Sequence, residues 1–191
     1  MLKTWRTMRI RALFALIDLT PARVSKRLYS ALSDRYRMRS SSLAYQMRVA
    51  LLRRMGARIG SRVKIAPGVF VDFAAKLKIG DQVSIQHYCF LSAYGGIEIG
   101  NDVSIGHGTS IVSSSHPFKG AGKIREAAVE EAPVRIGDNV WIGMKASILM
   151  GVRVGNGAVI GACSLVTRDV PAGVVAYGVP AKRIRSRRKE V

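Results

Sequence analysis

The sequence predicts an all-β solenoid preceded by a basic helical segment, and three observations support this fold class. An aliphatic residue recurs every six residues from Ile59 onward, glycine is enriched, and the positive charge is concentrated at the two ends of the chain. Glycine accounts for 19 of 191 residues, above the usual level of about 7%. Tight corners need small residues with permissive backbone angles, so a fold with many corners explains this excess.

The six-residue period holds at fifteen positions, with two short insertions and one long interruption. These positions are Ile59, Ile65, Val71, Ile79, Ile85, Leu91, Ile99, Ile105, Ile111, Ile136, Ile142, Ile148, Val154, Ile160 and Val166. Each block of six is expected to form a short strand and a corner, and three blocks close one triangular coil. Stacked coils bury the aliphatic ladder. About five coils fit between residues 59 and 171, which form the central part of the chain.

Residues 1–58 form a basic flank, with 14 basic and 2 acidic side chains and a net charge of +12. Thr20-Pro21 is typical of a helix start. A second helix is predicted from Ser42 to Gly56, with Met47 on its apolar face and Arg48 elsewhere on the helical wheel. Two interpretations stay open: the helices cap the solenoid, or they lie on an anionic membrane with arginines at the headgroups.

The remaining charge and the cysteines exclude several classes of protein. Residues 59–181 carry a net charge of only +2, and the tail at 182–191 carries +5. Because the basicity avoids the body and no recognition motif is present, nucleic-acid binding is not expected. Cys89 and Cys163 have no metal-ligand spacing, so neither a disulfide scaffold nor a zinc finger is predicted.

No apolar run in the sequence reaches the roughly 18 residues that a membrane-spanning helix needs. From the charge of the basic flank at residues 1–58, the expected location is cytoplasmic and peripheral on the inner face of the membrane.

Residues 113–133 interrupt the period as one long polar excursion. Long loops inside regular arrays are usually functional. His116 lies where the coil gives way to this loop, directly before Pro117. An imidazole with a pKa of about 6.5 can act as a general base near neutral pH, so His116 is a candidate catalytic residue. The sequence therefore divides into a flank (1–58), a solenoid with a candidate catalytic loop (59–171), and a C-terminal cap and tail (172–191).

Three segments resemble the hexapeptide-repeat acyltransferases: SSSHPF at 113–118, VRIGDNVWIG at 134–143 and VIGACSLVTRDVPAGVVAYGVPAKRIR at 159–185. The similarity is greatest to the galactoside, maltose and polysaccharide-modifying O-acetyltransferases. It implies a left-handed parallel β-helix, a homotrimer, and acetyl-CoA bound as donor between neighbouring subunits. It also implies that His116 is the general base toward a sugar hydroxyl.

The same resemblance implies the binding residues. The donor contacts are expected at Met144, Ala162, Thr167, Arg168, Lys182 and Arg185. Met144 stands where a serine is common, so only a packing or backbone contact is expected there, whereas the three cations suit the phosphates of the donor. The resemblance places acceptor contacts at Gln86 and Tyr94. Arg125, together with Glu126, is a further candidate for the acceptor because it lies in the long loop. Gln86 replaces an asparagine and Tyr94 an acidic residue, and both departures argue against galactosides and maltose as the acceptor.

His87 and His107 are the third residues of their blocks and lie 20 apart, so we expect them to stack on one edge with Met144 beyond them. The three histidines do not match the spacing of the β-helical carbonic anhydrases, and no metal is expected. The leading hypothesis is an O-acetyltransferase acting on a cell-envelope, capsular or exopolysaccharide precursor, lipid-linked sugars included. The alternatives are a non-catalytic solenoid that binds membrane or polyanion, and a zinc-dependent hydratase.

Overall fold

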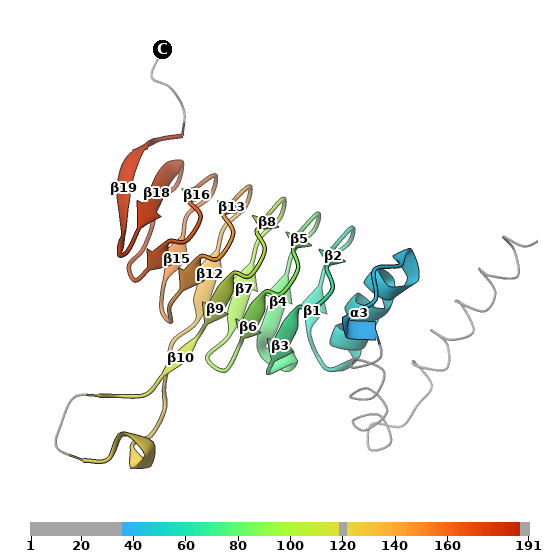
Figure 1. The fold of residues 1–191 in the computed structure, drawn as a ribbon, viewed down its shortest axis with the longest axis horizontal. Coiled ribbons are helices and arrows are strands. Elements are labelled where there is room, and N and C mark those ends of the chain that lie inside the picture. The colour runs from blue at the N-terminus through green and yellow to red at the C-terminus, as the bar shows by residue number, and fades with distance from the viewer. Residues whose placement is uncertain (1–35, 119–121, 188–191) are drawn as a thin grey trace, which may run out of the picture.

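A computed structural model describes residues 36–118 and 122–187. In this part of the chain the strands stack into a three-sided prism, with a helix at one end and a hairpin projecting near the other (Figure 1). Three parallel sheets form the sides. Five coils visit all three sheets, and β18 begins a further one, because Val170 also bridges Val154. The prediction of about five coils is confirmed.

We call the sides faces A, B and C, after the three strands of each coil. Face A contains β1 (Arg58–Ile59), β4 (Leu77–Ile79), β7 (Ile97–Ile99), β12 (Val134–Ile136) and β15 (Arg153–Val154). Face B contains β2 (Lys64–Ile65), β5 (Ser84–Ile85), β8 (Ser104–Ile105), β13 (Trp141–Ile142), β16 (Val159–Ile160), β18 (Val174–Gly178) and the antiparallel β19 (Ala181–Ser186). Face C contains β3 (Phe70–Asp72), β6 (Phe90–Ser92), β9 (Ser110–Val112), β14 (Ser147–Ile148) and β17 (Leu165–Val166).

The aliphatic ladder fills the interior, as the period predicts. Ile85 pairs with Ile105 in the next coil, and Ile105 with Ile142 after it, so like residues stack along the prism. Thirteen of the fifteen periodic positions are buried. Ile59 and Val71 are half-buried, since the first coil has no second coil on its outer side.

A ladder of Asp and Asn side chains holds the coils in register along the edge between faces A and B. The Oδ1 atom of Asp81 accepts a hydrogen bond from the backbone N of Ser61 at 2.6 Å. Asn101, Asp138 and Asn156 repeat the arrangement, each accepting from the backbone of the preceding coil at 2.7–3.0 Å. Hydrogen bonds from Ser61 hold the pKa of the Asp81 carboxyl below its ordinary value.

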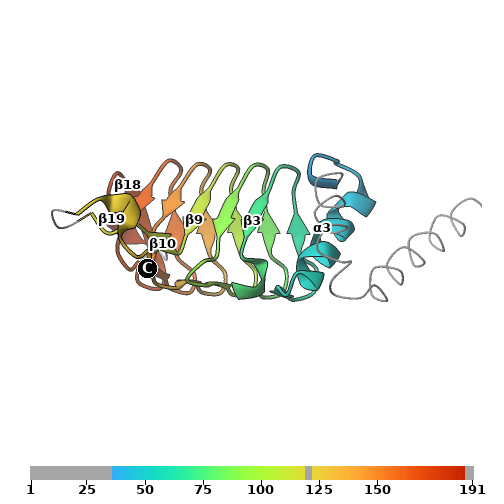
Figure 2. The same cartoon turned by 90° about the horizontal axis from the view of Figure 1, so that it is seen from below.

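Helix α3 (Ser42–Arg54) closes the N-terminal end of the prism, as Figure 2 shows. It begins where predicted, because the Ser41 side chain accepts from the backbone N of Ala44, and it is followed by Gly56 at φ +97°. Its apolar face, with Met47 at its centre, is buried. This helix is a cap on the solenoid. The helix predicted at Thr20-Pro21 lies outside the described residues.

Arg48 departs from its predicted place on the outer side of that helix, since only 6% of it is exposed. Its Nε donates to the carbonyl of Ile65 at 2.6 Å, and its Nη1 donates to the carbonyls of Tyr36 and Arg39 at 2.8 Å. Burial lowers the pKa of this guanidinium. Arg48 therefore joins the cap to the first coil. No helix in the described ranges is long and apolar enough to cross a membrane.

Candidate active site

His116 stands at the foot of a hairpin that leaves the edge between faces C and A. Strands β10 (Ser114–Ser115) and β11 (Glu130–Glu131) pair antiparallel and carry the projecting segment, which includes the short helix η2 (Ile124–Glu126). His116 follows β10 directly and is exposed. The side chain of Ser115 donates to the carbonyl oxygen of His116 at 3.4 Å, so this hydroxyl is not paired with the imidazole.

Ser113 anchors the hairpin to the solenoid. It is fully buried, and its Oγ donates to the carbonyl of Ser92 at 2.8 Å while accepting from the backbone N of Gly95 at 2.9 Å. Its own carbonyl accepts from the backbone N of Ala132 on the returning strand. The base of the hairpin is thus fixed on both sides, and His116 lies three residues beyond this anchor.

Tyr94 lies on the same edge as the hairpin. The Nζ of Lys76, in the short helix η1 (Ala74–Lys76), donates to the carbonyl of Tyr94 and forms a 3.3 Å ion pair with Glu131 of β11. The ring of Phe73 meets the ring of Tyr94 edge-on, with centroids 4.9 Å apart. The structure therefore brings Tyr94 and the foot of the hairpin together, as an acceptor site requires.

Arg125 lies farther out on the hairpin, in η2, and is highly exposed. Its Nη2 is 3.8 Å from Glu126, which also pairs with Lys123 at 3.1 Å. A hollow of about 260 Å³ lies on the hairpin and is lined by Pro117, Phe118, Gly122, Lys123, Ile124, Glu126 and Ala127. Pro117, which follows His116 in the sequence, is one of the residues that line this hollow.

Three of the predicted donor residues form a line along the edge between faces B and C. Met144, 46% exposed, is followed in the next coil by Ala162, whose neighbour Gly161 lies directly under Tyr177. Tyr177 pairs with Lys182 across the β18–β19 ribbon. A Cβ on Gly143 would lie 2.5 Å from the backbone N of Ala162, so this edge has room only for glycine there.

His87 and His107 continue this line toward the N-terminal end. Their rings stack with centroids 5.4 Å apart and an interplanar angle of 3°, which confirms the stacking predicted from their spacing. Met144 follows in the next coil, because Lys145 donates its backbone N–H to the carbonyl of His107. Among the described residues no three His, Cys, Asp or Glu side chains gather closely enough to hold a metal ion.

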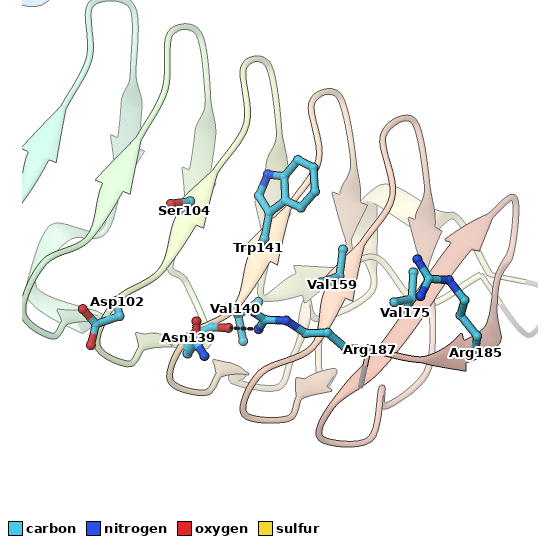
Figure 3. A pocket seen from close by; sticks show the side chains of 9 residues that line it. All are labelled: Asp102, Ser104, Asn139, Val140, Trp141, Val159, Val175, Arg185 and Arg187. Atoms are coloured by element: carbon cyan, nitrogen blue, oxygen red, sulfur yellow. Dashed lines mark hydrogen bonds between the residues drawn. The ribbon is translucent and has the colours of Figure 1, made fainter. Parts of the chain in front are cut away.

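Arg185 lies on face B, at a groove of about 610 Å³ near the C-terminal end. Figure 3 shows Trp141, Val159 and Val175 in successive strands, with Arg185 and Arg187 beside them. The Nη1 of Arg187 donates to the carbonyl of Asn139 at 3.1 Å, which fixes the tail against the coils. Trp141 comes one position before a buried isoleucine in the six-residue period, and side chains at that position point outward. The side chain of Trp141 is accordingly 59% exposed.

The predicted site residues lie on two different edges of the prism. His116 and Tyr94 lie on the edge between faces C and A, as do Thr167 and Arg168, which follow β17. Met144, Ala162 and Lys182 lie on the edge between faces B and C, and Gln86 lies on that edge nearer the cap. One chain therefore does not bring the proposed base and the full set of donor contacts together. Sequence reasoning also missed Ser113 and Lys76, which fix the hairpin.

The sequence matches a family model described as bacterial transferase hexapeptide (six repeats) over residues 133–168. Galactoside O-acetyltransferase from Escherichia coli K12 is 30% identical over 159 residues, which is 78% of this chain and 78% of that protein. A putative acetyltransferase from Schizosaccharomyces pombe is 43% identical over 81 residues, which is 42% of this chain and 38% of the length of that protein.

A solved structure extends the likeness to the whole prism. The hexapeptide-repeat acetyltransferase of Vibrio cholerae O1 biovar eltor, complexed with acetyl coenzyme A, superposes with a TM-score of 0.75 at 28% identity. The superposition covers 86% of this chain and 87% of that one.

Proposed function

The chain belongs to the hexapeptide-repeat acetyltransferases, in the branch that contains galactoside O-acetyltransferase, and on that premise we propose that it acetylates a hydroxyl group of a saccharide. Its fold is the left-handed parallel β-helix of this family, and acetyl-CoA is its acyl donor. This assignment favours an acetyltransferase over a non-catalytic solenoid or a zinc-dependent hydratase. The observation that supports the acceptor site best is the exposed His116 on an anchored hairpin.

In this proposal His116 acts as the general base. Its imidazole takes the proton of the acceptor hydroxyl as that oxygen attacks the thioester carbonyl, and it returns the proton to the departing sulfur. The hydroxyl of Ser115 faces a backbone carbonyl instead of the imidazole ring, so a serine nucleophile is not activated next to His116. The transfer is therefore direct, without an acyl-enzyme.

The residues expected to hold the donor suit its charges. Arg168, Lys182 and Arg185 are exposed, and among the described residues none of them forms an ion pair within 4 Å. Their charges remain available for the phosphates of coenzyme A, where guanidinium and ammonium groups form charge-assisted hydrogen bonds. Ala162 and Met144 line the edge through backbone and packing contacts.

The division of the site between two edges supports a homotrimer in which each active site lies between neighbouring chains. The edge with His116 on one chain would face the edge with Lys182 on the next. A complementation experiment tests this arrangement. At acetyl-CoA concentrations well below the raised KM of Lys182→Gln/Arg185→Gln chains, mixed trimers of these chains with His116→Ala chains should regain activity, since about a quarter of the sites combine two intact halves. No recovery in verified mixed trimers, or a fully active monomer, would contradict the shared site.

The acceptor is proposed to be a cell-envelope, capsular or exopolysaccharide precursor. A thiol-release assay with acetyl-CoA and a panel of glycans and lipid-linked sugars tests this class. His116→Ala should lower kcat on the best acceptor by roughly 10²–10⁴-fold with the fold intact, the usual effect of losing a general base. A near-normal kcat in this variant would refute the assignment of His116.

We also propose that residues 1–58 attach the enzyme to the inner face of the cytoplasmic membrane. Helix α3 buries its apolar face on the solenoid, so this proposal depends on the composition of residues 1–35, which lie outside the described part. Each basic residue near an anionic leaflet contributes about 1 kcal/mol. The protein should float with anionic liposomes, less so in high salt, and a chain starting at Ala57 should not. Equal flotation of the shortened chain would rule out this role.

A further inference from the structure

Two adjoining hollows lie between helix α3 and the first two coils, and we call them together the cap trough. Their volumes are about 740 Å³ and about 840 Å³. The first lies against the edge between faces A and B, and the second runs along face B toward Gln86. Gln46, Arg62 and Val63 line both hollows, so the two adjoin at these residues. Each hollow is in the size range of sites for small molecules, about 300–1,000 Å³.

The charge of the cap trough has one sign. Arg53, Arg54, Arg62 and Lys64 line it, and no acidic side chain of the described residues does. Residues 36–71 contain eight Lys or Arg and no Asp or Glu. The groove at the opposite end of face B differs, because Asp102 lines it together with its arginines.

The fold fixes one cation of the trough and leaves two others without an ion pair among the described residues. Arg53 is held rigidly, since its Nε and Nη2 donate to the carbonyl of Ile59 at 3.1 and 2.9 Å. Within the described ranges neither Arg62 nor Lys64 forms an ion pair within 4 Å. Asp81 lies on the same edge in the next coil, where the charge of Arg62 helps to lower the pKa of its carboxyl after the hydrogen bonds from Ser61. This carboxylate accepts from both the backbone N and the side chain of Ser61.

Arg62 also stands at a corner where its residue type is not the usual one. Its φ is +53°, and the equivalent corners of the later coils hold Gln82, Asp102, Asn139 and Gly157. Asp, Asn and Gly tolerate this left-handed conformation well, whereas arginine gains nothing from it. The corner at Arg62 therefore contributes a positive charge to the trough, which the residues at the equivalent corners do not.

Neutral polar side chains complete the lining beside the cations. The second hollow includes Ser42, Tyr45, Gln82, Ser84 and Gln86, which supply hydroxyl and carboxamide groups on one wall. Such groups exchange hydrogen bonds with the hydroxyls of a sugar. The trough therefore presents cations in one part and neutral hydrogen-bond donors and acceptors in another. This combination matches a ligand that carries both phosphate and hydroxyl groups.

We propose that the cap trough binds the phosphate or diphosphate of a phosphorylated saccharide. Arg62 and Lys64 hold the phosphate oxygens, and the neutral wall holds the sugar. This inference rests on the proposed function for the saccharide class. A free sugar nucleotide and a lipid-linked sugar share this chemistry, and the experiment below separates them.

The test is isothermal titration of the full chain with inorganic diphosphate and with UDP-glucose, in saturating coenzyme A so that the donor site is filled. Arg62→Gln/Lys64→Gln should weaken binding by about tenfold or more, the effect of losing charge-assisted hydrogen bonds. The control Arg58→Gln/Arg153→Gln removes two exposed charges from face A and should change the affinity less than about twofold. Equal losses in both variants, or no binding by the unmodified protein, would overturn the proposal.

A second arm identifies the carrier of the phosphate. Vesicles of neutral lipid with a polyprenyl diphosphate should retain the unmodified protein more strongly than the trough variant if the natural ligand is lipid-linked. If retention depends on Arg62 and Lys64 only with phosphatidylglycerol vesicles, and diphosphate does not compete, the trough binds a membrane surface and the proposal is wrong. Acetyl transfer to a phosphate-free glycan should be unchanged in the trough variant, which separates this test from that of His116.

Discussion

Replacing Ser113 by alanine should uncouple the hairpin from the solenoid while leaving the donor site intact. The hydroxyl is fully buried and accepts the backbone N–H of Gly95 at 2.9 Å. The carbonyl of Ser92 still receives the backbone N–H of Ser113 at 3.1 Å in the variant, so only the Gly95 N–H loses its partner. A buried donor without a partner costs about 1–3 kcal/mol, which is the expected loss in the free energy of unfolding.

The catalytic effect should exceed what this loss of stability explains. A displacement of about 1 Å in a catalytic group can lower the rate by about a hundredfold, and Ser113 lies three residues from His116. We therefore expect Ser113→Ala to lower kcat roughly 10–100-fold with an unchanged KM for acetyl-CoA. Urea unfolding and the thiol-release assay measure the two effects. Ser110→Ala is the control, because Ser110 lies outward on β9 and its side chain has no hydrogen bond among the described residues. A kcat within twofold of the unmodified enzyme, despite lower stability, would refute the positioning role.

Three further outcomes are expected. Arg48→Met should lower the free energy of unfolding by about 2–5 kcal/mol, because three carbonyls lose a charged donor, whereas Arg58→Met at the surface should change it by less than about 0.5 kcal/mol; urea titration measures both. The Asp81 carboxylate contributes stability above its ordinary pKa of about 3.9, and this contribution disappears as the pH falls through the lowered folded pKa. Asp81→Asn cannot take up that proton, so its melting temperature should fall less between pH 4 and pH 2. Neutralising the three donor cations, Arg168, Lys182 and Arg185, should raise the KM for acetyl-CoA and reduce discrimination against dephospho-coenzyme A. Steady-state kinetics measure the KM, and inhibition by coenzyme A and by dephospho-coenzyme A measures the discrimination.

The fold could be predicted from the sequence because each coil repeats the same physical requirement. A residue such as Ile105 must fill the interior at every sixth position, and a glycine such as Gly143 must leave room for the backbone of the next coil. The same period places His87 above His107, since a difference of 20 residues is one coil plus an insertion. Any property that depends only on the period was therefore accessible without a structure.

Arg48 shows where this reasoning stops. A helical wheel assigns an arginine to solvent, because the desolvation of its charge is costly. Here the cost is offset by the carbonyls of Tyr36, Arg39 and Ile65, two of which belong to the segment before the helix and one to the first coil. Nothing in the spacing of the sequence shows that these carbonyls converge, since the segments that carry them follow no repeat.

The active site marks a second limit of the same kind. The hairpin that carries His116 has no period, and its position depends on the buried Ser113 and on the ion pair between Lys76 and Glu131. The period does fix the edge that Met144 and Ala162 occupy, but no spacing within one chain shows which edges meet. His116 and Lys182 lie on different edges of one prism, so chemistry that needs both is possible only where a second copy brings its own edge alongside. Under the proposed mechanism assembly is then a condition for catalysis, and this is why the mixed-trimer experiment, more than any single substitution, tests the proposed active site.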